Sequence, residues 1–117
     1  MSSTRHLRLQ ERIMQETALI LRELKDPRIG MCSVVRAEVS QDGEFARIYV
    51  STLATGDAAE AAMKALRRAA GFVRTRLGEA LGTRKVPEIR FRLDESMRHS
   101  QRIDEILREI GPEEIGP

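Results

Sequence analysis

The spacing of apolar residues near the start of the chain predicts a helix over about Leu7–Leu24. Leu9, Ile13 and Ile20 fall on one helical face there, with Thr17 between them. A helix with one apolar face needs a partner to cover that face, so this segment is expected to pack against the rest of a domain.

Two strands are predicted to follow. Asp26-Pro27 ends the helix, because a residue that precedes proline is disfavoured in the α-helical conformation, and Gly30 allows a further turn. Apolar and polar residues then alternate over about Cys32–Ser40 and Glu44–Thr52, which is typical of strands with one buried face. Gln41-Asp42-Gly43 between them suits a hairpin connection. The side chains expected to face the core are Val35, Ala37, Val39, Ala46, Ile48 and Val50.

A long helical region comes next. It opens at Asp57, a favourable N-cap residue with Glu60 three positions later as in a capping box, and it closes at Gly82 as a C-cap. Gly71 interrupts the region, so two helices are predicted to meet at a kink near Ala69–Gly71. The apolar positions of the two helices are Ala58, Ala62, Ala65, Leu66, Ala69, Phe72, Val73, Leu77 and Leu81.

The remaining elements complete an α+β domain. Pro87 introduces a third strand, Glu88–Leu93, and a last helix is predicted over about Ser96–Ile110. The order helix, strand, strand, helix, kink, helix, strand, helix predicts two layers, a three-stranded sheet with helices on one face. Residues 1–110 are expected to form this single domain and residues 111–117 a short flexible tail. The open face of the sheet would carry Arg36, Arg47, Arg90 and Arg92.

Composition narrows the class of protein. The 117 residues fit one domain, and Cys32, the single cysteine, excludes an intramolecular disulfide. A polar N-terminus and the lack of any stretch approaching ~20 apolar residues predict a cytoplasmic protein without a membrane partner. No metal site, cofactor or catalytic residue is predicted, since His6 and His99 lack ligand spacing and Cys32 has no base near it in sequence. We therefore expect a protein that is not an enzyme.

Charge is distributed unevenly. The net charge is only +2, but residues 64–92 hold nine basic and two acidic side chains, whereas residues 93–117 hold three basic and seven acidic ones. A basic middle segment is typical of a surface that binds a polyanion, and a solvated surface rich in arginine is an equally good interpretation of charge alone. A nuclease would need a cluster of acidic metal ligands, and the basic segment contains only Glu79 and Glu88.

A succession of short motifs resembles a known family. The motifs are Arg5, Arg8-Leu9, residues 16–21 (ETALIL), 25–30 (KDPRIG), 46–50 (ARIYV), Ala65-Leu66, 69–74 (AAGFVR), 86–91 (VPEIRF) and Asp94. In order and spacing they are similar to ribosome-binding factor A, the bacterial factor that assists maturation of the small ribosomal subunit. The resemblance runs from about Arg5 to about Leu107. Thr17 departs from it, because it stands where an aliphatic residue is usual.

The resemblance implies a fold and a function. The fold is a type II K-homology (KH-like) RNA-binding domain in which the usual Gly-x-x-Gly loop is replaced by the kink Ala69-Ala70-Gly71. The function implied is binding to the immature small (30S) ribosomal subunit, near the place where the 5′ end of its ribosomal RNA is folded and trimmed. It also implies a role in growth in the cold, and release helped by a ribosome-assembly GTPase. A general KH-type RNA-binding or regulatory protein is the alternative.

Basic side chains are the candidate site residues, because an arginine fork meets phosphate oxygens in pairs. The set is Arg67, Arg68, Arg74, Arg76, Arg84, Lys85, Arg90 and Arg92, with Arg5 and Arg8 added from the N-terminal part of the chain. The kink either presents these side chains or clamps an RNA backbone directly, and the methyl group of Ala69 favours the first alternative. Phe45 and Tyr49 either stack on bases or are covered by neighbouring side chains. A monomer is expected, because no coiled-coil repeat is present.

Overall fold

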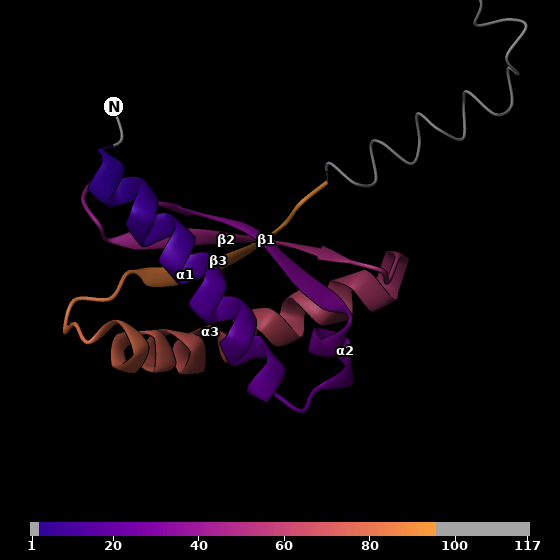
Figure 1. The fold of residues 1–117 in the computed structure, drawn as a ribbon. Coiled ribbons are helices and arrows are strands. Elements are labelled where there is room, and N and C mark those ends of the chain that lie inside the picture. The colour runs from indigo at the N-terminus through magenta and orange to yellow at the C-terminus, as the bar shows by residue number, and fades with distance from the viewer. Residues whose placement is uncertain (1–2, 96–117) are drawn as a thin grey trace, which may run out of the picture.

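The computed structural model describes residues 3–95. It contains the helices α1 (Thr4–Glu23), α2 (Pro27–Gly30) and α3 (Gly56–Leu81), and the strands β1 (Cys32–Val39), β2 (Phe45–Thr52) and β3 (Glu88–Leu93). The helix predicted over 96–110 and the tail predicted over 111–117 lie outside the described residues. Figure 1 shows α1 lying across the strands and α3 running beneath them.

The sheet has the order β1-β2-β3, so β2 is central. The hairpin pairs β1 with β2 in antiparallel fashion, whereas β3 pairs with β2 in parallel after the crossover through α3. The side chains of α1, α3 and one face of the sheet form the core, and the other face carries charged residues. The prediction of a two-layer α+β domain with a three-stranded sheet is confirmed, and the arrangement is consistent with a KH-like fold.

The core is aliphatic and centres on β2. Ala46, Ile48 and Val50 are fully buried, and they alternate with exposed or half-buried neighbours as the sequence pattern predicts. Phe91 of β3 is the one large aromatic side chain in the described core. Burying side chains of this kind stabilises a fold by roughly 1.5–3 kcal/mol each, so the sheet is held chiefly by this layer. The other large core residues come from α1, α3 and β3 and include Ile13, Ile20, Leu66, Val73, Leu77 and Ile89.

A β-bulge changes the face of one predicted core residue. The register between β1 and β2 shifts between Val34 and Arg36, which leaves Val35 39% exposed while Val34 packs against the core. The expectation that Val35 faces the core is therefore wrong. A bulge inserts one unpaired residue and shifts the alternation of side chains on one side of it. Ala37 and Val39, beyond the bulge, are buried as predicted.

A short helix, α2, follows α1 where the sequence predicted only a turn. Asp26 is its N-cap: the carboxylate accepts a hydrogen bond from the backbone N–H of Arg28 at 2.9 Å and forms an ion pair with the Arg28 guanidinium at 2.8 Å. These side-chain and backbone hydrogen bonds from Arg28 lower the pKa of Asp26. Pro27 therefore has two roles, since it ends α1 and occupies the first turn of α2, where its missing N–H costs nothing.

Helix α3 is continuous, and this corrects the prediction of two helices. Ala69, Ala70 and Gly71 all lie within it, and its ribbon changes direction along its length instead of breaking. One glycine removes no backbone hydrogen bond, so a helix can bend there without ending. The side chain of Phe72 is 46% exposed and does not belong to the core as predicted.

The C-terminal end of α3 agrees with the prediction, and the N-terminal end does not. The N-cap is Thr55, whose side chain makes no capping hydrogen bond, and Asp57 lies inside the first turn. Asp57 was therefore wrongly predicted as the cap, although a carboxylate in a first turn still interacts favourably with the helix dipole. Gly82 is confirmed as the C-cap: its φ is +65° and its N–H donates to the Gly78 carbonyl at 3.0 Å.

Candidate nucleic-acid interface

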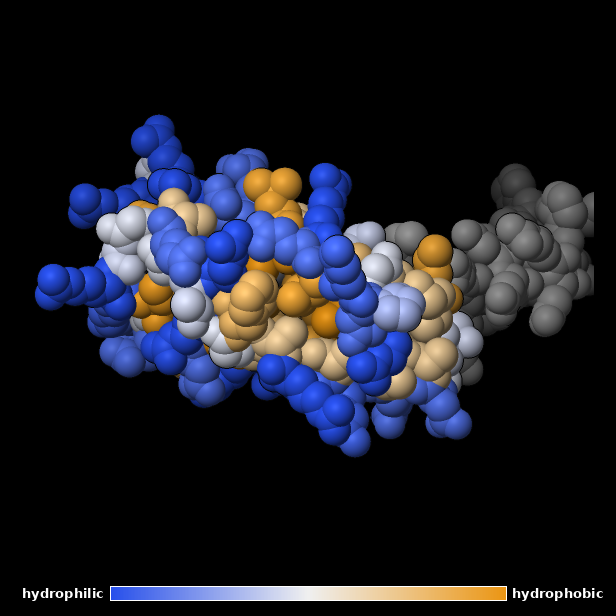
Figure 2. All heavy atoms as spheres, turned by 90° about the horizontal axis from the view of Figure 1, so that it is seen from below, coloured by the Kyte–Doolittle hydropathy of each residue, from blue (hydrophilic) through white to orange (hydrophobic). Residues whose placement is uncertain are grey.

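The ten predicted basic residues occupy several places on the surface. Arg5 and Arg8 are exposed on α1, Arg67 to Arg76 lie along α3, and Arg84 and Lys85 lie in the connection to β3. Arg90 and Arg92 project from β3. Seen from the α3 side, long hydrophilic side chains surround a patch of apolar surface (Figure 2). The set is thus divided among separate regions, and the internal bonds of each residue decide which of them can meet RNA.

Two arginines of α3 are used inside the fold. Arg74 donates two hydrogen bonds, from Nε and Nη2, to the Val86 carbonyl at 3.1 and 2.8 Å, and so ties α3 to the segment that precedes β3. Arg76 donates to both carboxylate oxygens of Glu23 on α1 at 2.9 Å and pairs with Glu79 at 3.2 Å. Hydrogen bonding to Glu23, the largest cause, raises the pKa of Arg76. These two guanidinium groups therefore hold elements together before any ligand arrives.

The open face of the sheet is covered by its own charged side chains. The guanidinium of Arg36 lies over the Tyr49 ring at 3.9 Å, and that of Arg90 lies over the Phe45 ring at 4.3 Å. Arg36 also pairs with Glu38 and Arg90 with Glu88, each at 3.3 Å. Of the two interpretations of the aromatic rings, the structure favours coverage by neighbouring side chains, since a base would have to displace an arginine to stack there.

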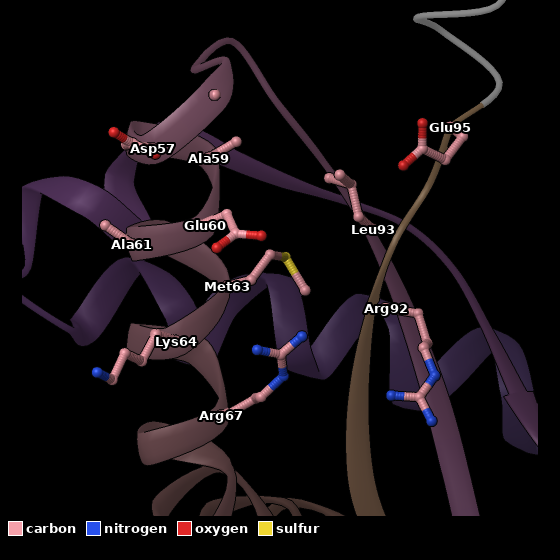
Figure 3. A pocket seen from close by; sticks show the side chains of 11 residues that line it. Asp57, Ala59, Glu60, Ala61, Met63, Lys64, Arg67, Arg92, Leu93 and Glu95 are labelled. Atoms are coloured by element: carbon pink, nitrogen blue, oxygen red, sulfur yellow. The ribbon is translucent and has the colours of Figure 1, made fainter.

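A groove between α3 and β3 brings basic residues from two elements together. It has a volume of about 770 Å³ and lies between the first half of α3 and the end of β3. Figure 3 shows Met63 and Arg67 extending from α3 toward the space that faces Arg92 and Leu93 of the strand. The groove thus combines apolar surface from Met63 and Leu93 with the guanidinium of Arg67, and Arg92 lies on the strand that borders it, which suits a ligand that has both flat apolar and anionic parts.

Charge is polarised along this groove. Asp57, Glu60 and Glu95 lie toward one end, and Lys64, Arg67 and Arg92 lie toward the other (Figure 3). Within the described residues, Lys64 and Arg67 have no hydrogen bond or ion pair, and Arg92 has one long hydrogen bond to the Phe91 carbonyl at 3.4 Å. The basic end of the groove therefore offers cationic groups that the described fold leaves almost unused.

The other predicted site residues differ in how free they are. Arg68 lies outside this groove, in a smaller hollow of about 310 Å³ near α2. Lys85 is partly engaged, with Glu44 at 3.4 Å and the Asp42 carbonyl at 3.4 Å. Arg5, Arg8 and Arg84 are exposed and make no hydrogen bond or ion pair with other residues in the range 3–95. They can add to an electrostatic surface without belonging to the groove.

Lys64 is a functional candidate in addition to the ten basic residues predicted from the sequence. It was counted in the basic segment, but the structure places it beside Arg67 at the groove. The available signal was the spacing of three residues between Lys64 and Arg67 on one helix, which makes them neighbours.

Other kinds of site have little support in the described chain. Cys32 is half-buried and its thiol donates to the Arg28 carbonyl at 3.6 Å, and burial raises the pKa of this thiol. A raised pKa leaves less of the reactive thiolate at neutral pH. Among residues 3–95, no three His, Cys, Asp or Glu side chains are grouped so that they could hold a metal ion. None of the described helices combines the length and the apolar character needed to cross a membrane.

Comparisons with known proteins give a consistent result. Residues 5–107 match the model of a family described as ribosome-binding factor A. The chain is 43% identical over 114 residues to ribosome-binding factor A of Thermomicrobium roseum, an alignment that covers 97% of this chain and 88% of the relative. It is 40% identical over 114 residues to that of Brevibacillus brevis, where the alignment covers 97% and 94%.

Solved structures share the fold. A Thermotoga maritima protein described as a putative ribosome-binding factor A, solved by NMR, has a TM-score of 0.72 and 33% identity, covering 82% of this chain and 92% of that one. The crystal structure of ribosome-binding factor A from Thermus thermophilus has a TM-score of 0.69 and 25% identity, covering 75% and 94%. A homology model of the Thermus thermophilus factor, fitted into the cryo-EM map of its complex with the 30S subunit, has a TM-score of 0.66 and 23% identity, covering 77% and 96%.

Proposed function

The chain belongs to the ribosome-binding factor A family, and on that premise we propose that it binds the immature small ribosomal subunit as an assembly factor. The Thermus thermophilus factor named above was fitted into a map of a complex with the 30S subunit. The observation that carries the proposal for this chain is the basic end of the groove, which is lined by Lys64 and Arg67 of α3 and by Arg92 of β3, with Arg67 extending into it (Figure 3).

The proposed contacts are mainly with phosphate. Arg67 extends into the groove from α3, and Arg92 projects on the other side of the strand that borders it, so the two forks can engage separate phosphates of an RNA backbone (Figure 3). Met63 and Leu93 supply apolar surface beside them, on which an unpaired base can rest. Arg5, Arg8, Arg68 and Arg84 extend the positive surface, while Arg74 and Arg76 contribute by holding α3 in place.

We propose that the protein assists RNA folding and 5′-end processing without catalysis. A protein that binds one RNA conformation more tightly than its competitors shifts the equilibrium toward that conformation, and this needs no chemical step. The factor must also leave, and a ribosome-assembly GTPase is the proposed partner for release. A cytoplasmic monomer, whose residues 1–110 form one RNA-binding domain, and a role in growth in the cold complete the proposal.

Co-sedimentation across a salt series tests the proposal. The full chain is mixed with purified 30S subunits, 50S subunits and 70S ribosomes, and we expect migration with 30S subunits alone, lost as salt rises. The variant Arg67→Gln/Arg92→Gln should bind 30S subunits roughly tenfold more weakly with a shallower salt dependence. Arg22→Gln, at an exposed position on α1 away from the groove, is the matched control and should bind normally.

Two results would contradict the proposal. Binding to free RNA strands but to none of the three particles would replace the ribosomal function by that of a general KH-type RNA-binding protein. Cleavage of precursor RNA by the purified protein with added magnesium would replace assembly without catalysis by a nuclease activity.

A further inference from the structure

The charged residues of α3 that border the groove form an ordered stripe. Asp57, Glu60, Lys64 and Arg67 follow one another at intervals of three, four and three residues, so they lie along one side of the helix, with Glu60 and Arg67 directed toward the groove and Asp57 and Lys64 at its outer edge (Figure 3). Their charges run from two negative at the N-terminal end to two positive further along. Over ten residues this stripe is about 15 Å long.

The C-terminal segment of the same chain carries the opposite order. Arg98, Arg102, Glu105 and Glu109 follow one another at intervals of four, three and four residues, with two positive charges before two negative ones. At helical spacing these four share one face, and Ile103, Ile106, Leu107 and Ile110 lie on the adjoining face. Such a segment has one charged and one apolar stripe, which match the charged side and the apolar surface of the groove.

From these two patterns we infer that residues 98–110 bind in the groove between α3 and β3 of their own chain. The binding of this segment does not depend on the proposed function. Its consequence does rest on that function, because a segment bound there covers the cationic side chains proposed to bind RNA.

The register follows from the spacing. Two helical segments that run in the same direction rise equally per residue, so a nearly constant difference in residue number keeps partners side by side. The difference in residue number is fixed to within one when Arg98 lies opposite Asp57 and Arg102 opposite Glu60. The same difference then places Glu105 opposite Lys64 and Glu109 opposite Arg67. All four pairs are of opposite charge. Each exposed pair contributes little alone, so the set gives register and direction more than affinity.

The chain enters the groove at the end that this register requires. Glu95, the last described residue, lines the groove, and Figure 3 shows it toward the same end as Asp57. Two residues, Ser96 and Met97, separate it from Arg98 and allow the chain to reverse. They span at most ~10 Å between Glu95 and Arg98, so Arg98 stays close to the end of the groove that Glu95 lines.

This arrangement makes the segment a built-in competitor of RNA. Because the segment is tethered next to the groove, its effective concentration there is in the millimolar range, and RNA must displace it to reach Lys64, Arg67 and Arg92. The factor would then bind only RNA that offers several phosphates at once. Its affinity for short, nonspecific strands would be reduced.

Disulfide trapping tests the inference in the full chain without RNA or ribosomes. In a Cys32→Ser background, Lys64→Cys is combined with Glu105→Cys, and the rate of disulfide formation in a glutathione buffer is measured on non-reducing gels. We expect about tenfold faster trapping than for Arg22→Cys with Glu105→Cys, the control pair away from the groove. Adding Arg67→Glu should slow trapping, and Glu109→Arg on top of it should restore the rate.

Each of the other outcomes would contradict one part of the inference. Equal rates for the two cysteine pairs, or no rescue by Glu109→Arg, would reject the docking. Disulfide-linked dimers that form faster at higher protein concentration would assign the groove to a second copy instead. Adding 30S subunits should slow trapping, and unchanged trapping with bound subunits would reject the competition. Failure of subunit binding itself would leave the trapping rates unaltered, so the two proposals fail separately.

Discussion

Arg76 on α3 grips both carboxylate oxygens of Glu23 on α1, each at 2.9 Å, although the two residues are 53 positions apart in sequence. The pair joins the two helices that cover the sheet. Because its guanidinium already bonds to Glu23, the main role of Arg76 is to stabilise the fold and not to bind a ligand.

Arg76→Gln should therefore lower stability more than binding. We expect a lower melting temperature, measured by circular dichroism, because one clamp between α1 and α3 is lost. The affinity of the folded fraction for 30S subunits should change little. Arg67→Gln is the matched variant with the opposite expectation, weaker binding at an unchanged melting temperature, since Arg67 makes no internal ion pair within residues 3–95. Equal melting temperatures for both variants would contradict the division of roles.

Thr17→Val should stabilise the protein by about 1 kcal/mol. Thr17 is 0% exposed, and its hydroxyl oxygen has no hydrogen-bond partner in the described structure. Valine has nearly the same shape and removes the buried polar group. Urea unfolding measures the change. Thr75→Val is the control and should give no such gain, because the Thr75 hydroxyl is exposed and donates to the Gly71 carbonyl at 3.1 Å.

Gly82→Ala should destabilise the protein by roughly 1 kcal/mol, because φ at this C-cap is +65°, where a Cβ is strained. Gly30→Ala is the matched control. Gly30 has no positive φ, and nothing lies within 4 Å of the position that its Cβ would take. Thermal or urea unfolding of the two variants side by side checks the difference, and an equal loss in both would argue against strain at the cap.

Cys32 should react slowly with thiol reagents in the native protein. Burial raises the pKa of this thiol above its ordinary value, with a hydrogen bond to Thr52 opposing the rise, so the thiolate fraction near pH 8 is reduced. We expect labelling at pH 8 to be slower in the native than in the urea-unfolded protein, and the native rate to go on rising at higher pH. Equal rates in the two states would show that the thiol is not protected.

The same raised pKa sets the sign of a pH effect on stability. The native state holds the thiol proton more tightly than the unfolded state does. The thiol's contribution to the free energy of unfolding is therefore fully present at a pH below its pKa in the unfolded state, and it is lost as the pH rises through its pKa in the native state. The free energy of unfolding of the wild type should thus fall more steeply above pH 9 than that of Cys32→Ser.

The alternation in β2 and β3 predicted their core residues because the aliphatic side chains of each strand share one register. β1 has two, since Val34 and Val35 are both apolar, and the sequence does not reveal which of them the bulge turns outward. The α3 kink was overestimated for a related reason. Gly71 permits a break, but the continuous packing of Leu66, Val73 and Leu77 keeps the helix whole.

The sequence predicts which residues of the candidate site carry charge, but it does not predict which partners those charged side chains have in the fold. Sequence spacing identifies Arg74 and Arg76 as basic, but their partners at Val86 and Glu23 are set by tertiary structure. Conversely, Arg67 and Arg92 are 25 positions apart and border the same groove only because β3 returns beside α3. Charge composition therefore points to a segment, and the fold decides which of its basic residues are left without internal partners in the described structure.

The parallel pairing of β3 with β2 also has a consequence for how a new molecule matures. β1 and β2 can pair as soon as the hairpin has been synthesised, whereas β3 cannot join until all of α3 has been made. Until then β2 keeps one bare edge, and Ile48 lacks Phe91, its partner across the strands. Arg92 and Leu93, which form one side of the groove, arrive at the same late moment. The groove proposed to bind RNA is therefore incomplete in a nascent chain until β3 has been synthesised.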